Sequence, residues 1–428
     1  MSDHPFSKRQ LAYLSPWFED VSQVRMESLG VTGGFSGAVI WRVSMAELEA
    51  RRGGLEHDAG QHRAGQHRAG QHRAPSHSDL CLRRWPQVHP SLTGLQAIHG
   101  LLSHVTAQGY EIVPMPRETR YGETYFVYED HLWELTSWLP GEASFASDPT
   151  ALKLTAAMQA LARFHQAAQT YRPASSNTGG FAGETARLAP SPGLQQRLTM
   201  IKSLQQGELQ QLWSKTRTAE ASDLRELAFE LLEGTGRSVD SVGSYLEQIV
   251  DVPLPLQWCL RDVRHDHVLF TGEEVSGLLD FGAVAVDSVA GDLSRLLGSI
   301  VNDHAETWQA GIVAYSKVRQ LSLAEQRAII GFDHGGLLCS ATNWVRWLFV
   351  EGRSFPQIHA LHAQLLWLRD RLQSLTSLST ASAAKHHAGP TWAQSSQKHS
   401  LEHQREHPLG PSASSSPQRA NGSPWMHT

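Results

Sequence analysis

A short group of strand-like segments between residues 254 and 282 interrupts a long series of helical patterns. The apolar run "LPLQWCL" (254–260) precedes a loop that contains Asp262, and a later hairpin pattern turns at "TGEE" (271–274). Asp280 follows the second arm of that hairpin. Because the two ends of a hairpin lie close together, we expect Asp262 and Asp280 to face one pocket. The alternative for either residue is an aspartate in an exposed turn.

Residues 1–140 favour strands, with one helix among them. Alternating apolar and polar residues predict strands at 38–45 and 78–85, and two more within 119–139. Residues 91–109 carry leucine and isoleucine at helical spacing and end in glycine, a pattern typical of a capped helix. This part of the chain is therefore predicted to be a β-rich lobe.

Helical patterns dominate the rest of the chain. Residues 150–171 place Leu154, Met158 and Leu161 on one face of a helix. Further helices are predicted at 193–213, 219–250, 286–301, 304–319, 323–350 and 357–376. The sequence therefore predicts an α+β fold of two lobes, with a small β-rich N-terminal lobe and a larger, mainly helical C-terminal lobe.

Composition excludes several classes of partner. The chain has 428 residues and a formal charge of −5, without the concentrated basic face that nucleic acid requires. Its 3 cysteines lie far apart, which indicates reduced thiols and not a disulfide framework. No apolar run approaches the roughly 18 residues of a membrane span. We expect a cytoplasmic protein that binds neither nucleic acid nor membrane.

Two segments have the composition of disordered chain. Residues 51–79 contain "GQHRA" three times in succession (60–74), with no apolar side chain larger than alanine in the repeat. Residues 378–428 are dominated by serine, glutamine, histidine, proline and glycine. We expect a disordered histidine-rich insertion and a disordered tail. Metal binding by the histidines is the alternative function for the insertion.

The two aspartates also match a set of ordered motifs. Transfer of a phosphoryl group from ATP needs a clamp on the phosphates, carboxylates for magnesium, and a carboxylate that orients the attacking hydroxyl. The chain resembles the aminoglycoside phosphotransferase and choline kinase family, relatives of the protein kinases. In that family a catalytic-loop aspartate is followed five residues later by a metal-binding asparagine, and then by a metal-binding aspartate in a D-F-G-like turn. The resemblance assigns Asp262 as catalytic and Asp280, in "LLDFG", as a metal ligand.

The resemblance extends over roughly residues 22–370, without the insertion. It implies that Asp292, in "AGDLSRLLG", starts a helix and braces the catalytic loop. It also places an interlobe hinge in "LWELTSWLPGEAS" (132–144), where the backbone from Glu134 through Thr136 to Ser137 would meet adenine.

The N-terminal lobe carries the expected phosphate contacts. Gly33, Gly34 and Gly37 would let backbone amides approach the phosphates of ATP or GTP. Arg83 stands where the family usually has a lysine, and Arg84 is the alternate candidate. The helix predicted at 91–109 has no acidic residue to pair with either arginine.

The chain departs from the family pattern at two positions of the loop. The histidine that precedes the catalytic aspartate is Leu260, and the metal-binding asparagine is His267. Magnesium prefers oxygen ligands, so a site with His267 as a ligand should tolerate Mn²⁺ or prefer it over Mg²⁺. An active kinase of a small-molecule hydroxyl and a pseudokinase that binds nucleotide or a partner both remain open.

We divide the chain accordingly. Residues 1–21 are an N-terminal extension, residues 22–137 the nucleotide-binding lobe, residues 138–377 the catalytic and substrate lobe, and residues 378–428 the tail. Acidic residues in the second lobe are scattered, which does not favour a polycationic aminoglycoside as the acceptor.

Overall fold

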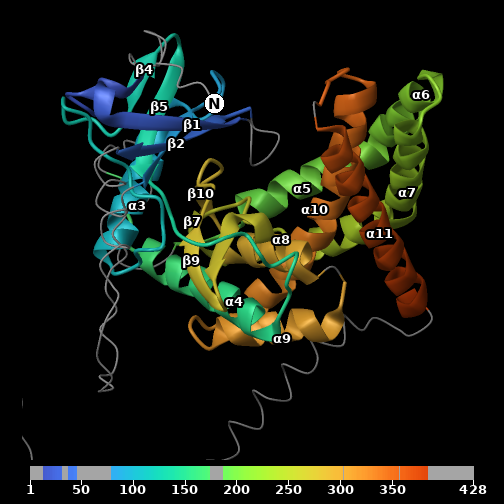
Figure 1. Cartoon of the computed structure of the whole chain (residues 1–428). Helices are drawn as coiled ribbons and strands as arrows, with labels where there is room; N and C mark the ends of the chain where they lie inside the picture. The colour runs from blue at the N-terminus through green and yellow to red at the C-terminus, as the bar shows by residue number, and fades with distance from the viewer. Residues whose placement is uncertain are drawn as a thin grey trace, which may run out of the picture. The chain divides into compact units, whose positions relative to one another are not determined.

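The N-terminal lobe is built on a five-stranded antiparallel sheet (Figure 1). The computed structural model describes residues 13–30, 37–45, 79–173, 187–301, 303–355 and 357–383. The strands are β1 (Val24–Gly30), β2 (Val39–Met45), β3 (Asp79–Arg84), β4 (Phe126–Tyr128) and β5 (His131–Ser137), in the order β1-β2-β3-β5-β4. Helix α3 (Leu92–Ala107) is capped by Ser91, and Gly109 follows it with a φ of 86°.

The core of this lobe includes residues that precede the sheet. Leu14 is fully buried with Val24, Val43 and Leu82, and Tyr13, Trp17 and Phe18 pack against the same cluster. The ring of Tyr13 stacks on Trp133 at 4.4 Å between centroids. The N-terminal lobe therefore begins before residue 22, the boundary predicted from the sequence.

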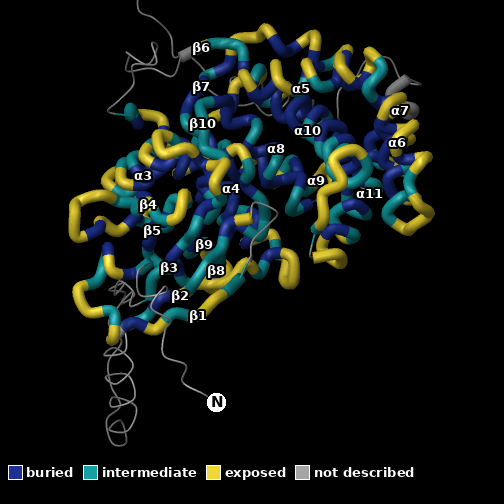
Figure 2. Tube along the Cα trace, turned by 90° about the horizontal axis from the view of Figure 1, so that it is seen from above, coloured by how far each residue is buried: buried dark blue, intermediate teal, exposed yellow. Residues whose placement is uncertain are grey.

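The C-terminal lobe consists mainly of helices. They are α4 (Ala151–Ala168), α5 (Pro192–Ser203), α6 (Leu209–Thr218), α7 (Asp223–Ile249), α8 (Val289–Val301), α9 (Ala305–Ser316), α10 (Leu323–Phe349) and α11 (Ile358–Ala383). Helix α10 packs against α5, α7, α8 and α11, so it lies at the centre of this group. Figure 2 shows buried residues along α4, α8 and α10 and exposed residues in the connecting loops.

Short strands carry the loops that matter for chemistry. Strand β7 (Leu254–Cys259) lies between β10 (Ala285–Asp287) and β6 (Arg187–Ala189). Strands β8 (Val268–Thr271) and β9 (Glu274–Leu278) form the predicted hairpin, and Gly272 has a φ of 64° in its turn. Three-residue strands such as β6 and β10 are too short to produce a readable alternation in the sequence.

The short helical turns are η1 (Val21–Gln23), η3 (His265–His267) and the π-helical segment η2 (Leu204–Glu208). The helix predicted at 193–213 is divided by η2, where Gly207 has a φ of 120°. The fold class predicted from the sequence is confirmed.

Helix α11 continues to Ala383, so the predicted tail begins later than residue 378. The histidine-rich repeat and the rest of the tail lie outside the described residues. Within the described ranges, no helix is both long and apolar enough to cross a membrane.

Candidate active site

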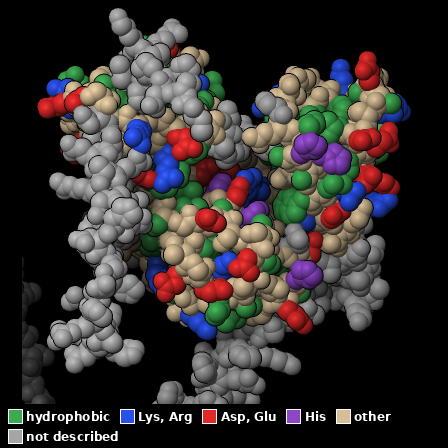
Figure 3. All heavy atoms as spheres, in the orientation of Figure 1, with side chains coloured by type: hydrophobic (Ala, Val, Ile, Leu, Met, Phe, Trp, Pro, Cys, Tyr) green, Lys and Arg blue, Asp and Glu red, His purple; other side chains and the backbone are tan. Residues whose placement is uncertain are grey.

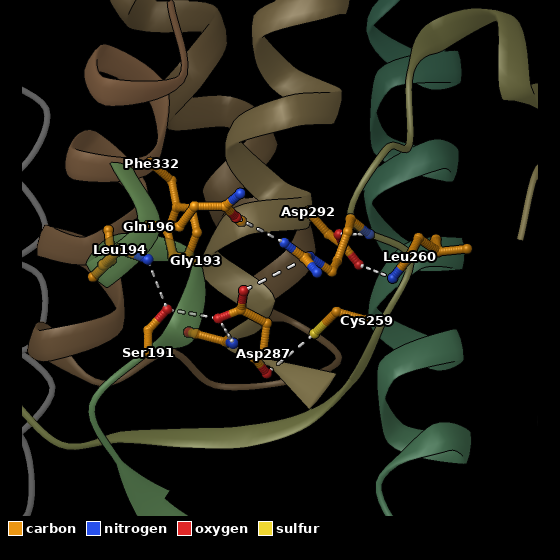
Figure 4. A network of polar contacts seen from close by, with 12 residues as sticks. Ser191, Gly193, Leu194, Gln196, Cys259, Leu260, Asp287, Asp292 and Phe332 are labelled. Carbon is orange, nitrogen blue, oxygen red and sulfur yellow. Dashed lines mark hydrogen bonds and ion pairs between the residues drawn. The ribbon is translucent and has the colours of Figure 1, made fainter. Parts of the chain in front are cut away.

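The loop after β7 is fixed by a buried carboxylate in the first turn of α8. Asp292 is fully buried and accepts hydrogen bonds from the backbone amides of Leu260 at 2.7 Å and Arg261 at 2.6 Å (Figure 4). Arg261 has a φ of 67°, a left-handed conformation that side chains rarely adopt unless the surroundings hold it. The loop is therefore pinned one residue before Asp262.

A histidine on α4 completes this support. The Nε2 atom of His165 lies 3.0 Å from an oxygen of Asp292, and its Nδ1 atom lies 2.8 Å from the hydroxyl of Tyr315. Burial lowers the pKa of His165, so we infer a neutral ring that donates from Nε2 and accepts at Nδ1. Leu260, at the position of the family histidine, is fully buried and packs as an apolar side chain.

The set His165, Cys259 and Asp292 has ligand atoms within 4.8 Å of one another, but it does not fit a metal site. Both oxygens of Asp292 already accept backbone amides. Burial raises the pKa of the Cys259 thiol well above its usual range, which disfavours the thiolate that a metal requires. We treat the set as structural.

The carboxylate of Asp262 is bound through one of its two oxygens. Arg295, one turn beyond Asp292 on α8, donates from Nε at 3.0 Å and from Nη2 at 2.8 Å, both to Oδ1 of Asp262. The side chain of Asp262 remains 45% exposed. Among the described residues these bonds leave Oδ2 available for an acceptor hydroxyl.

Asp280 follows β9 with a φ of 60°. The amide of Gly282 donates to Oδ1 of Asp280 at 3.3 Å, which orients the carboxylate within its turn. Oδ2 lies 3.6 Å from Nε2 of His267, which comes from η3 and is 5% exposed. The structure thus brings together the two residues predicted as metal ligands.

The separation of these atoms fits a shared divalent cation. Two ligands that each lie about 2.1 Å from Mg²⁺ are at most about 4.2 Å apart, and the Asp280 and His267 atoms are 3.6 Å apart. Oδ1 of Asp266 lies 3.8 Å from the same nitrogen, but Asp266 is also bound by Arg264. One carboxylate oxygen and one imidazole nitrogen form a donor set that suits Mn²⁺ at least as well as Mg²⁺.

Arg264 places a positive charge among these carboxylates. Its Nε donates to Asp266 at 3.0 Å. Burial disfavours the charged guanidinium, but Asp266, then Asp262 and Asp280, raise the pKa of Arg264. Neither Arg264 nor its pair with Asp266 was predicted from the sequence, where both read as loop residues.

Arg83 is held by an acid from the neighbouring strand. Strands β3 and β5 pair Arg83 with Glu134, and Nε of Arg83 lies 3.6 Å from the Glu134 carboxylate. Burial opposes the charge, whereas Glu134, followed by Cys81 and Asp280, raises the pKa of Arg83. The guanidinium also lies 4.7 Å from the ring centroid of Trp85. Arg84 lies instead over Trp133, at 6.0 Å.

Helix α3, which has no acidic residue to pair with Arg83, contributes His99 to the pair of Arg83 and Glu134. His99 Nε2 lies 2.7 Å from Oε2 of Glu134, and its Nδ1 lies 2.7 Å from the hydroxyl of Thr124. Burial opposes ionisation of Glu134, yet the hydrogen bond to His99 and the positive charge of Arg83 lower its pKa. The chain His99–Glu134–Arg83 therefore links α3 to β3 through β5.

The backbone around Glu134, where the sequence predicted the hinge, is paired within the sheet. Residues Glu134 to Thr136 pair with β3 on one side. On the other side Arg117 donates to Leu135 at 2.7 Å, and Ser137 donates to Met115 at 2.9 Å. Much of the backbone from Glu134 to Ser137 is thus hydrogen-bonded within the protein, and its contact with adenine stays a prediction.

The segment after β5 lies on the β8–β9 hairpin. Gly141 has a φ of 94°, and a Cβ atom there would lie 2.5 Å from the carbonyl oxygen of Phe270. Ser276 donates to the carbonyl of Pro140 at 2.7 Å. The segment can therefore approach the hairpin only with glycine at position 141.

The turn that carries Asp280 is tied to the N-terminal lobe. His89 donates from Nε2 to the carbonyl of Gly282 at 2.7 Å. A Cβ atom on Gly282 would lie 3.2 Å from the ring of Trp85, the ring that also faces Arg83. Of the predicted glycine-rich contacts, Gly33 and Gly34 lie outside the described residues, and Gly37 has a φ of 77° with open space around it.

A cavity of about 270 Å³ opens beside Asp262. Helices α5, α8, α10 and α11 and the loop after β7 enclose it. Its charged lining residues are Arg197, Arg261, Asp262, Arg295, Asp333 and Arg371. The helices after residue 300 thus supply much of the wall.

A model of the phosphotransferase enzyme family matches residues 59–327, well over half of the chain. The chain is a member of that family. The predicted family and enzyme class are therefore confirmed. The phosphotransferase is 26% identical over 257 residues to a homoserine kinase of Beijerinckia indica subsp. indica, a match that covers 59% of this chain and 69% of the relative.

Solved structures share the fold of the phosphotransferase at low identity. A spectinomycin phosphotransferase, solved with ADP and spectinomycin, has a TM-score of 0.55 at 11% identity and covers 89% of this chain and 99% of its own. An amicoumacin kinase, solved with AMP-PNP, Ca²⁺ and Ami, has a TM-score of 0.51 at 13% identity and covers 86% of this chain and 94% of its own.

Proposed function

We propose that this phosphotransferase moves the γ-phosphoryl group of ATP to a hydroxyl group of a small molecule. The observation that carries the proposal is the setting of Asp262, bound through one oxygen by Arg295 and open to the cavity through the rest of its carboxylate. In this reaction the acceptor oxygen forms a bond to the γ-phosphorus, and the bond from that phosphorus to the bridging oxygen of ADP breaks. The hydroxyl proton goes to Asp262.

The remaining residues have separate roles in this proposal. Arg83, oriented by Glu134 and Trp85, binds phosphate oxygens with a planar fork. Asp280 and His267 would hold a divalent ion, which would neutralise phosphate charge. Asp292 keeps the loop in position without touching substrate, so it is a positioning residue.

Nucleotide-dependent thermal stabilisation and product formation together test the proposal. The full chain is mixed with ATP and Mg²⁺ or Mn²⁺ and then with a panel of hydroxylated metabolites that includes L-homoserine, the substrate in the name of one relative. We expect stabilisation by the nucleotide and ADP release that depends on one class of acceptor. Stabilisation without turnover on any acceptor would favour the pseudokinase, since Leu260 and His267 depart from the family pattern.

A further inference from the structure

The charged side chains that line the cavity beside Asp262 are mainly cationic. Its lining includes four arginines, Arg197, Arg261, Arg295 and Arg371, against two carboxylates, Asp262 and Asp333. In Figure 3 basic and acidic side chains are interspersed over the face shown, and not gathered by sign. The concentration of four arginines around one cavity is thus a local feature.

Two of the four arginines are neutralised by carboxylates. Arg295 binds Asp262. Arg371 binds Asp303 at 2.9 Å and Asp333 at 2.8 Å, and its side chain is 5% exposed. These two guanidiniums therefore serve the architecture of the wall.

Among the described residues, Arg261 has no carboxylate within hydrogen-bond distance. Its Nε lies 3.9 Å from Oδ2 of Asp287, beyond hydrogen-bond distance. The other oxygen of Asp287 already accepts from the hydroxyl of Ser191 at 2.6 Å and from the amide of Ser288 at 2.8 Å (Figure 4). Arg261 donates otherwise to the amide oxygen of Gln196, at 3.4 Å. Much of its hydrogen-bonding capacity therefore remains unused within the described residues.

Arg197 is held in place without a carboxylate. Its Nε donates to the carbonyl of Phe332 at 3.2 Å and its Nη1 to the carbonyl of Gly193 at 3.0 Å. The ring of Phe332 lies 4.6 Å from the guanidinium carbon. Within the described part of the chain, no acidic side chain lies within 4.0 Å of this guanidinium. Burial lowers the pKa of Arg197, so its charge is costly without an anion beside it.

We propose that the acceptor carries an anionic oxygen group, a carboxylate, which binds Arg197 and Arg261 while the acceptor hydroxyl faces Asp262. The proposal rests on the phosphotransfer proposed above. Two carbonyls and an aromatic ring fix the orientation of Arg197 before ligand arrives, and a planar guanidinium matches a carboxylate through two parallel hydrogen bonds. A cavity of about 270 Å³ suits a small hydroxy acid. The same lining disfavours polycationic acceptors.

Binding of charged and uncharged acceptor pairs to the full chain tests this assignment. Calorimetry with ADP and Mg²⁺ present compares 4-hydroxybutyrate with 1,4-butanediol, L-homoserine with L-homoserinol, and glycerol 3-phosphate with glycerol. We expect the carboxylates to bind at least about tenfold more tightly than their neutral partners, the scale of one hydrogen bond to a charged group. Preference for glycerol 3-phosphate alone would replace the carboxylate by a phosphate and overturn the assignment.

Variants identify the cavity as the place of binding. Arg197→Gln should remove most of the preference for the charged member of each pair. Arg261→Gln is the second variant, since its side chain is 37% exposed and its replacement leaves the core intact. Lys202→Gln is the matched control. Lys202 lies on α5, as Arg197 does, but outside the cavity, 3.2 Å from Glu247.

The outcomes separate this inference from the proposed reaction. Equal affinity for charged and neutral partners, or no binding of any carboxylate, would overturn the inference. A preference that persists in both arginine variants would overturn it as well. Anion binding that depends on Arg197, without turnover on any acceptor, would support an anion site but refute phosphotransfer.

Discussion

Replacing Glu134 by glutamine should destabilise the N-terminal lobe and weaken ATP binding at the same time. The carboxylate is 5% exposed and contacts Arg83 at 3.6 Å and His99 at 2.7 Å. Removing one partner of a buried ion pair costs about 3–5 kcal/mol, because the remaining charge is left uncompensated. Glutamine keeps an amide oxygen for Arg83, so we expect the lower end, about 3 kcal/mol.

A double-mutant cycle isolates the contact between the two side chains. Arg83→Met, Glu134→Gln and the double variant are compared by urea unfolding and by titration with ATP and Mg²⁺. The double variant leaves no unpaired guanidinium, so its loss should be smaller than the two single losses together by about 1–3 kcal/mol. It should still bind ATP poorly, because the cation at the phosphates is gone. Glu27→Gln, on the exposed side of β1, is the matched control and should change stability by no more than about 0.5 kcal/mol.

The cycle can also contradict this reasoning. Strictly additive losses would mean that Glu134 does not stabilise Arg83. A Glu134→Gln variant with unchanged stability but weak ATP binding would instead indicate that the carboxylate contacts the nucleotide directly.

Three further predictions concern the metal, the segment after β5, and pH. His267→Asn should shift the preferred ion from Mn²⁺ toward Mg²⁺ in a metal titration of nucleotide binding, since an amide oxygen replaces an imidazole nitrogen; an unchanged preference would remove His267 from the site. Gly141→Ala should lower the free energy of unfolding by at least about 1–3 kcal/mol, because its Cβ atom would lie 2.2 Å from Ser276 Oγ at a φ of 94°; normal stability would show that the segment moves freely. His165 has a lowered pKa when folded, so the unfolded state binds the extra proton and stability should fall as pH drops below about 6.5, by up to about 1.4 kcal/mol per pH unit. Urea unfolding across that range should lose this component in His165→Asn, and a stability that rises toward acid would contradict the sign.

Local patterns in the sequence were enough to predict many helices and strands and the proximity of Asp280 to His267. Helical periodicity predicted α4 and α10, and the turn at "TGEE" predicted the β8–β9 hairpin. The proximity of Asp280 to His267 follows from that hairpin, because the two residues flank it. These features depend on short stretches of chain, which a single sequence reports directly.

Features that depend on register or on distant packing were missed. The pair of Arg83 and Glu134 exists because β3 and β5 align at that register, and His99 reaches it from α3. Sequence spacing gives no register between strands separated by a helix.

The arginine cavity could not be predicted for a related reason. Arg197 and Arg371 lie far apart in the sequence, on α5 and α11. They line the same cavity because both helices pack against α10. In the sequence nothing connects these two arginines. Their common environment is a tertiary property.

The affinity of Asp262→Asn and Asp280→Asn for ATP in the presence of Mg²⁺ or Mn²⁺, measured beside their turnover, tests the central claim most directly. Asp262→Asn should bind nucleotide almost as the unmodified protein does, while turnover falls by about a hundredfold or more. Asp280→Asn should weaken the metal-dependent part of nucleotide binding itself, because a carboxylate leaves the coordination shell. Equal nucleotide affinity and equal turnover in both variants and the unmodified protein would contradict the assignment of catalysis to Asp262 and of metal binding to Asp280.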